Sequence, residues 1–127
     1  MSSPHRARSR TAAFRAAFAG WWYVLRTQRN AWIHALATIL VIGMGIWLRI
    51  NRLEWVALLL AIGLVWLAEF LNTALEAVVD LASPQVHQLA RVGKDVGAAA
   101  VLISAITAVL IGLLVLGPPL LAKLGTP

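Results

Sequence analysis

The chain has 127 residues, of which 61% are hydrophobic and only 13% are charged, with 11 Lys and Arg against five Asp and Glu. This composition excludes an ordinary soluble globular protein, in which about a quarter of the residues are charged. It indicates an all-α integral membrane protein. Cysteine is absent, which excludes disulfides, thiolate metal sites and cysteine nucleophiles.

The first 28 residues divide into a tail and a predicted surface helix. Residues 1–10 carry three arginines and almost nothing that can be buried, so we expect a disordered basic tail. Over residues 11–28, apolar residues recur at helical spacing beside a basic face, which predicts an amphipathic helix lying on the membrane. Trp21 and Trp22 suit the membrane interface. Basic residues in this setting match anionic lipid headgroups, so the positive charge does not indicate a nucleic-acid partner.

Three long apolar runs predict three transmembrane helices, over residues 31–50, 53–81 and 88–116. Pro118 and Pro119 are expected to end the third helix, since proline removes a backbone donor and clashes with the preceding turn. Residues 11–118 would then form a single membrane domain, and residues 119–127 a short C-terminal tail.

Basic residues are unevenly distributed in this arrangement. Eight of them lie in the N-terminal segment and around the loop between the second and third spans, against Arg49, Arg52 and Lys123 at the other membrane face. Lys and Arg concentrate in cytoplasmic segments. We therefore expect a multi-pass protein whose N-terminus and second loop are cytoplasmic.

The second span carries the most informative polar pattern of the chain. At about 100° per residue, five polar side chains project within one arc of this helix: Glu69, Asn72, Thr73, Glu76 and Asp80. Charged groups at membrane depth are costly and normally face a protein interior or water, so this stripe is a candidate functional site. Hydrogen bonding to neighbouring helices is the alternative explanation for each residue taken singly.

The two glutamates of the stripe lie at different depths. At about 1.5 Å rise per residue, Glu69 is roughly 10 Å deeper in the membrane than Glu76. A shallow carboxylate such as Glu76, with Asp80 one turn further out, can hold a hard cation such as Mg²⁺ together with phosphates. A deep carboxylate can accept a proton from an alcohol. We therefore expect metal binding at Glu76 and proton transfer at Glu69.

The third span begins on the same side of the membrane with Lys94 and Asp95. Lys94 can neutralise a transferring phosphate, and Asp95 can fix Lys94 or contact a nucleotide. A snorkelling lysine paired with an aspartate is the alternative. The glycines match neither of the soluble nucleotide-binding fingerprints, GxGxxG and GxxxxGK[ST]. We interpret His34, inside the first span, and His87, before the third, as structural or solvated residues.

From Phe14 to about Pro118, the chain resembles the prokaryotic diacylglycerol kinases. The resemblance rests on EFLNTALEAVVD at residues 69–80 and GKDVGAAAVLI at residues 93–103. Further positions are similar to the undecaprenol kinase branch of the family: Asn30, His34 and Glu54-Trp55. The resemblance implies a homotrimer of three-span subunits in the bacterial inner membrane, with shared active sites near its cytoplasmic face. It also implies transfer of the γ-phosphate of ATP, with Mg²⁺, to a lipid alcohol, either diacylglycerol or undecaprenol.

The resemblance further implies roles for single residues. Glu69 matches the family's catalytic base, and Glu76 matches its metal-binding and ATP-site glutamate. The other matched positions are a polar neighbour of the base, a nucleotide-contacting pair and a residue of the loop beside the nucleotide: Asn72, Lys94 with Asp95, and His87. Asp80 would give polar support to the same site.

Gln28 departs from the family pattern. The family generally places a second metal-binding glutamate at the end of the surface helix, where this chain has Gln28. An amide oxygen is a weaker, uncharged ligand than a carboxylate. We therefore expect Glu76, the ATP phosphates and Gln28 to hold the metal with less negative charge than the usual site. A weakened or inactive relative is the alternative.

A small oligomeric transporter or channel subunit, with Glu69 and Glu76 lining an ion path, is the alternative function. The polar residues gather in the cytoplasmic half of the predicted spans, however. The outer halves of the second and third spans offer a permeant ion little besides Ser104 and Thr107. The sequence therefore favours a lipid kinase, and only the resemblance favours undecaprenol over diacylglycerol as its substrate.

Overall fold

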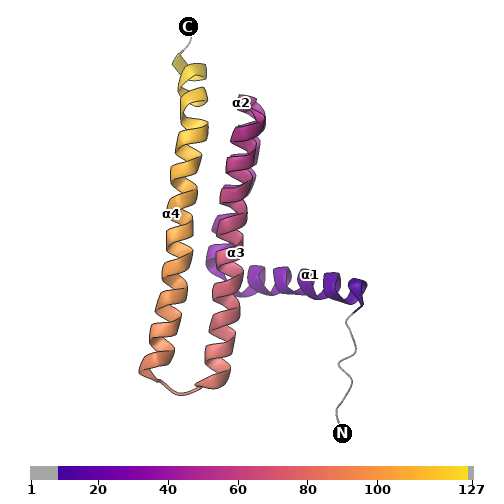
Figure 1. The fold of residues 1–127 in the computed structure, drawn as a ribbon, viewed down its shortest axis with the longest axis vertical. Coiled ribbons are helices and arrows are strands. Elements are labelled where there is room, and N and C mark those ends of the chain that lie inside the picture. The colour runs from indigo at the N-terminus through magenta and orange to yellow at the C-terminus, as the bar shows by residue number, and fades with distance from the viewer. Residues whose placement is uncertain (1–8, 126–127) are drawn as a thin grey trace.

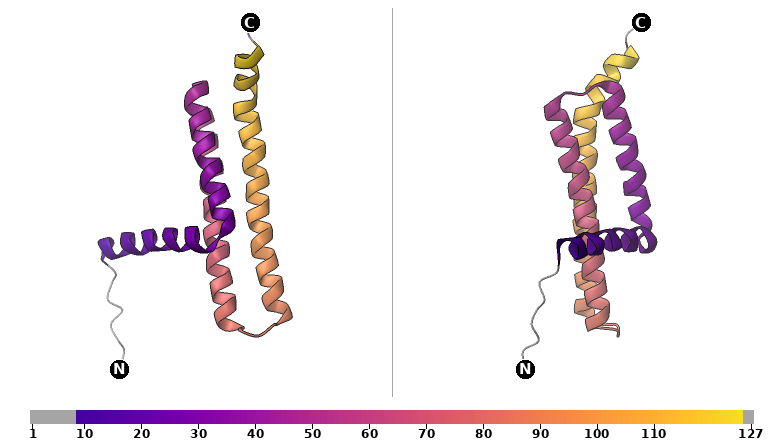
Figure 2. Two further views of the ribbon diagram at one scale, coloured as in Figure 1. Left: turned by 180° about the vertical axis from the view of Figure 1, so that it is seen from behind. Right: turned by 90° about the vertical axis from the view of Figure 1, so that its right-hand side faces the viewer.

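The computed structural model describes residues 9–125, which form four α-helices. Their bounds are α1, Arg10–Thr27; α2, Arg29–Leu48; α3, Arg52–Ala82; and α4, Gln88–Gly125. The last three run side by side as a bundle, and α1 projects from it at a steep angle (Figure 1). Two further views show the same arrangement, with α3 and α4 forming a long antiparallel hairpin (Figure 2).

The start of α1 is set by Ser9, whose hydroxyl accepts a hydrogen bond from the backbone N–H of Ala12 at 3.3 Å. Such a cap satisfies a donor that the first helical turn leaves free. Ser9 and Arg10 therefore belong to the helix start, whereas the rest of the predicted disordered tail, residues 1–8, lies outside the described residues. A single residue with extended backbone, Gln28, separates α1 from α2.

The three bundle helices are each long and apolar enough to cross a membrane, which is consistent with the three predicted spans. α3 begins with a capping box at the end of the bundle opposite the α3–α4 loop. The Asn51 side chain accepts from the Glu54 N–H at 3.0 Å, and the Glu54 carboxylate accepts from the Asn51 N–H at 2.8 Å. This reciprocal pair satisfies two free donors. Glu54, the one acidic residue that precedes the polar stripe, therefore has a structural role.

The C-terminal end of α4 differs from the sequence prediction. Pro118 and Pro119 were expected to end the helix at residue 116, but both lie inside it, and it continues to Gly125. The expectation was wrong because proline removes one hydrogen bond and bends a helix without having to end it. In the right-hand view of Figure 2, the last turns lean away from the axis of the preceding ones. Most of the predicted tail, residues 119–127, is accordingly helical.

The bent end of α4 is held against α2 by Lys123. Its Nζ lies 4.4 Å from the centroid of the Trp47 ring and donates to the Trp47 carbonyl at 3.3 Å. A cation over an aromatic face is attracted by the ring quadrupole. The contact provides part of the stabilisation that the two prolines remove from this end of the helix.

Aromatic packing fixes α1 against the middle of α3. Val24 and Ala31, at the two sides of the α1–α2 junction, are buried together with Trp66. Trp21 adds ring contacts to Trp66 and Phe70, with centroid separations of 4.7 and 4.6 Å. Large aromatic side chains contribute strongly to such interfaces. α1 therefore meets α3 at the point where the polar stripe begins.

Candidate functional site

The polar stripe of α3 becomes more exposed toward the α3–α4 loop. Glu69 is 1% exposed, and the next two members, Asn72 and Thr73, are also buried. Glu76 is half-buried and Asp80 is exposed. Glu69, which is predicted to lie deeper, is thus more buried than Glu76. The stripe extends from a dry interior to the surface.

Glu76 lies beside the junction of α1 and α2. One of its carboxylate oxygens accepts a hydrogen bond from Gln28 Nε2 at 3.2 Å, and the other accepts from Asn72 Nδ2 at 3.2 Å. Gln28 reaches Glu76 because it forms the one-residue link between the two helices. The fold therefore places residues 28 and 76, which the sequence analysis assigned to one metal site, next to each other.

The metal-binding groups at this junction fit Mg²⁺ only if a bound ligand supplies further oxygen atoms. Among residues 9–125, no group of three or more His, Cys, Asp or Glu side chains is arranged to hold a metal ion. Glu76 offers one carboxylate and Gln28 one amide oxygen. Mg²⁺ is usually bound through one or two carboxylates, with substrate phosphates and waters completing its octahedron. The pair therefore fits a cation that arrives together with a phosphate-bearing ligand.

Asn72 lies directly against α4. Its Oδ1 is buried and has no hydrogen-bond partner among the described residues. A Cβ added at Gly97 would collide with this oxygen, so glycine at position 97 allows the close approach of the two helices. Thr73 differs, because its hydroxyl donates to the backbone carbonyl of Glu69 at 2.8 Å. Asn72 is thus available to a further partner, whereas Thr73 is satisfied within its own helix.

Glu69 faces α2, where it meets His34. The His34 Nε2 and Glu69 Oε2 atoms are 3.4 Å apart, and the side chains are 13% and 2% exposed. Neither atom has a hydrogen-bond partner among the described residues. The sequence alone indicates a structural role for His34 and does not reveal this contact. The available signal was that His34 is the one ionisable residue in the interior of the first span.

Lys94 and Asp80 form an ion pair across the α3–α4 hairpin, with Nζ and Oδ1 2.5 Å apart. Asp80, rather than Asp95, is therefore the carboxylate that fixes Lys94. Consecutive helical residues do not face each other, whereas residue 80 lies opposite residue 94 on the neighbouring helix. Asp95 is exposed. The pair brings two predicted site residues together at the exposed end of the stripe.

His87 caps the start of α4. Its Nδ1 accepts a hydrogen bond from the backbone N–H of Leu89 at 3.1 Å, and the side chain is exposed. The contact satisfies one of the donors that the first turn of α4 leaves free. His87 thus has a structural function, which agrees with its interpretation from the sequence. It lies at the same exposed end of the hairpin as Lys94.

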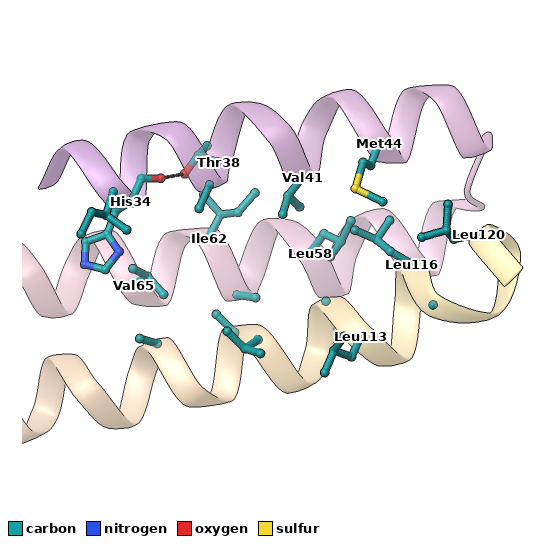
Figure 3. A pocket seen from close by; sticks show the side chains of 18 residues that line it. His34, Thr38, Val41, Met44, Leu58, Ile62, Val65, Leu113, Leu116 and Leu120 are labelled. Atoms are coloured by element: carbon teal, nitrogen blue, oxygen red, sulfur yellow. Dashed lines mark hydrogen bonds between the residues drawn. The ribbon is translucent and has the colours of Figure 1, made fainter. Parts of the chain in front are cut away.

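An apolar groove of about 450 Å³ lies between α2, α3 and α4. Figure 3 shows His34 at one end of the labelled lining and Leu120 toward the other, with Val41, Met44 and Leu58 between them. The polar exceptions are His34 and Thr38, both on α2. The groove therefore has an apolar wall along its length and polar side chains near the end that approaches Glu69.

Comparison with known proteins finds similarity to lipid kinases along most of the chain. The family model of prokaryotic diacylglycerol kinase matches residues 15–116. A diacylglycerol kinase of Synechocystis sp. is 45% identical over 111 residues, which make up 87% of this chain and 63% of that protein. An undecaprenol kinase of Bacillus subtilis is 40% identical over 101 residues, 80% of this chain and 82% of its own length. A diacylglycerol kinase of Escherichia coli is 37% identical over 95 residues, 69% of this chain and 78% of its own length.

Proposed function

The chain belongs to the prokaryotic diacylglycerol kinase family, and on this basis we propose that it transfers the γ-phosphate of ATP to the hydroxyl of a membrane lipid alcohol. The match covers less than two thirds of the Synechocystis relative and more than three quarters of the other two. The observation that carries the proposal is the placement of a dry Glu69 and a half-buried Glu76 on one face of α3. This arrangement suits a reaction between a lipid and a water-soluble nucleotide.

The shallow end of the stripe would bind the nucleotide. Glu76 and Gln28 would hold Mg²⁺ jointly with the phosphates, and Mg²⁺ would supply charge neutralisation at the phosphoryl group. Lys94, which is partly exposed beside Asp80, can reach a phosphate from the neighbouring helix. Asp95 and His87 lie at the same end of the hairpin, where the resemblance places nucleotide contacts.

The deep end would activate the lipid alcohol. Glu69 accepts the hydroxyl proton as the alcohol oxygen forms its bond to the γ-phosphorus atom. The bond from the γ-phosphorus to the β–γ bridging oxygen breaks, and ADP leaves with the electron pair of that bond. Asn72, whose Nδ2 donates to Glu76 and whose unpartnered oxygen lies against Gly97, would orient groups between the two glutamates. Catalysis would thus rest on positioning and charge neutralisation.

The topology proposed for this function is an inner-membrane protein with a cytoplasmic N-terminus. In this orientation α1 would lie on the cytoplasmic membrane surface, nearly perpendicular to the spans (Figure 1). Support comes from aromatic side chains of α1 that remain exposed in the single chain: Phe14, Phe18 and Trp22. Aromatic and basic residues on one helix favour the interface of a membrane with anionic lipids. The resemblance further suggests a homotrimer.

The test is phosphate transfer by the purified protein in mixed lipid and detergent micelles. ATP labelled in its γ-phosphate is incubated with diacylglycerol or with undecaprenol, and label in the extracted lipid is counted. We expect Mg²⁺-dependent label in at least one lipid, and the ratio of the two rates identifies the substrate. No label with either lipid, together with ion flux in protein-containing vesicles, would support the channel alternative instead. Light scattering of the detergent complex separately tests the trimer.

A further inference from the structure

The contact between His34 and Glu69 has no role in the reaction described so far. We propose that His34 is a positioning residue for Glu69, an inference that rests on the proposed lipid kinase function. A small rotation brings the His34 Nε2–H into a hydrogen bond with Glu69 Oε2. This bond fixes the orientation of the buried carboxylate and leaves Oε1 for the lipid hydroxyl.

The first support is that two buried polar atoms face each other without other partners. The atoms are 3.4 Å apart, and neither is hydrogen bonded within the described chain. Nearly all buried polar atoms in proteins have a partner. Their separation exceeds an ordinary N–H···O bond by a few tenths of an ångström, and catalytic hydrogen bonds often shorten only when substrate is present. A small rotation of either side chain therefore satisfies both atoms.

The second support is that the His34 segment is held in place from two sides. The Thr38 hydroxyl donates to the His34 carbonyl at 2.7 Å, and Trp66 Nε1 donates to Thr38 Oγ1 at 3.1 Å. The Trp66 ring also lies edge-on to the imidazole, with centroids 6.2 Å apart. Figure 3 shows the imidazole turned from α2 toward α3. A ring fixed in this way can orient the carboxylate beside it, because its own position is determined.

The third support is the lack of another group that could perform this task. Glu76, the nearest carboxylate along the stripe, is two turns away and is occupied by Gln28 and Asn72. The groove-lining residues that α4 contributes are uncharged, Ala105 and Val109 among them. Within the described residues, His34 is the side chain placed to hold the Glu69 carboxylate in one orientation.

The kinetic test compares three variants of the full-length protein. His34→Leu removes the donor, His34→Gln keeps an N–H donor on a side chain of similar reach, and Thr38→Val breaks the neighbouring α2–α3 hydrogen bond without touching Glu69. We expect His34→Leu to lower kcat about 10- to 100-fold with the KM for ATP unchanged, since a hydrogen bond to a charged group is lost. His34→Gln should stay within a few-fold of the original kcat, and Thr38→Val, which loosens the His34 segment but keeps its imidazole, should lose less kcat than His34→Leu. Equal losses in all three variants, or full activity of His34→Leu, would overturn the proposal.

A second measurement does not depend on activity. The infrared carboxylate stretching band of Glu69, identified by its loss in Glu69→Gln, should shift in His34→Leu, because the carboxylate loses a hydrogen bond. If the original protein transfers no phosphate to either lipid, the proposed function is wrong. The infrared band still tests whether His34 contacts Glu69. If the protein is an active kinase and the band is the same with and without His34, the positioning role is wrong and the proposed function stands.

Discussion

Glu69 and Glu76 are identical side chains on one face of one helix, yet the fold gives them opposite surroundings. Glu69 is 1% exposed, and its Oε2 faces His34 with no hydrogen bond in the described residues. Glu76 is half-buried, and both of its oxygens accept hydrogen bonds from amide groups. The difference matches the roles proposed for the two residues, in which Glu69 accepts a proton and the amide partners of Glu76 give way to a cation and phosphates.

The origin of this difference is the position of the α1–α2 junction. Gln28, in the single-residue link, reaches α3 at the height of Glu76. His34 lies almost two turns further along α2, and it therefore meets α3 almost two turns deeper, at Glu69. Because α2 and α3 run in opposite directions in the bundle, increasing residue number on α2 corresponds to decreasing number on α3. The α1–α2 link thus supplies the partner of Glu76, and α2 supplies the partner of Glu69.

The largest expected effect comes from removing the charge at the deep position. Glu69→Gln keeps the size of the side chain but cannot accept a proton, and general-base catalysis typically contributes about 10²- to 10⁴-fold. We expect kcat to fall by at least about 100-fold, while ATP binding and the elution volume of the protein in detergent stay unchanged. Phosphate transfer and binding of a fluorescent ATP analogue provide the two readouts. Loss of the assembled protein together with activity would assign Glu69 a structural role and remove the functional contrast with Glu76.

A smaller effect, at the shallow position, is expected from Gln28→Glu. The variant places a second carboxylate next to Glu76, where the Gln28 amide now donates. Two adjacent carboxylates repel each other but bind a hard cation more strongly, because the charge of the ligands tunes affinity. We expect the Mg²⁺ concentration for half-maximal activity to fall several-fold, with kcat little changed.

Gln28→Leu is the matched control for this variant, because it removes the amide oxygen without adding charge and should raise the Mg²⁺ requirement. Titration of Mg²⁺ at saturating ATP compares the three proteins. An unchanged or increased requirement in Gln28→Glu would show that position 28 does not act on the metal.

The features of this site that follow from one helix could be predicted from the sequence. Helical periodicity alone places Glu69, Glu76 and Asp80 on one face, and the apolar runs predict three long helices that the structure contains. The adjacency of Gln28 and Glu76 was expected from the family pattern rather than from periodicity. This adjacency depends on the residue at which α1 ends. A resemblance to a family can indicate that residue, whereas the hydrophobic pattern of a single sequence cannot.

Contacts between helices could not be predicted in the same way. The pairing of His34 with Glu69 depends on how α2 is rotated toward α3, and an apolar helix with one histidine does not define that rotation. The pairing of Lys94 with Asp80 depends on the register of the α3–α4 hairpin, which the loop between the two helices sets. The continuation of α4 past Pro118 could not be predicted for a related reason, because the effect of a proline on a helix depends on the packing around it as well as on the residue.

The smallest effect is expected at the exposed end of the stripe, from Asp80→Asn. The change removes the partner of Lys94, but both side chains are substantially exposed, and exposed ion pairs contribute little to stability. We therefore expect an unchanged unfolding temperature in detergent and a modest decrease in the KM for ATP, because Lys94 becomes free to contact phosphate and one negative charge is removed. Lys94→Gln, which removes the cation itself, should raise the KM in the same assay. If Asp80→Asn instead lowered the unfolding temperature, the ion pair would hold the hairpin together, and the exposed end of the stripe would be a structural element rather than part of the nucleotide site.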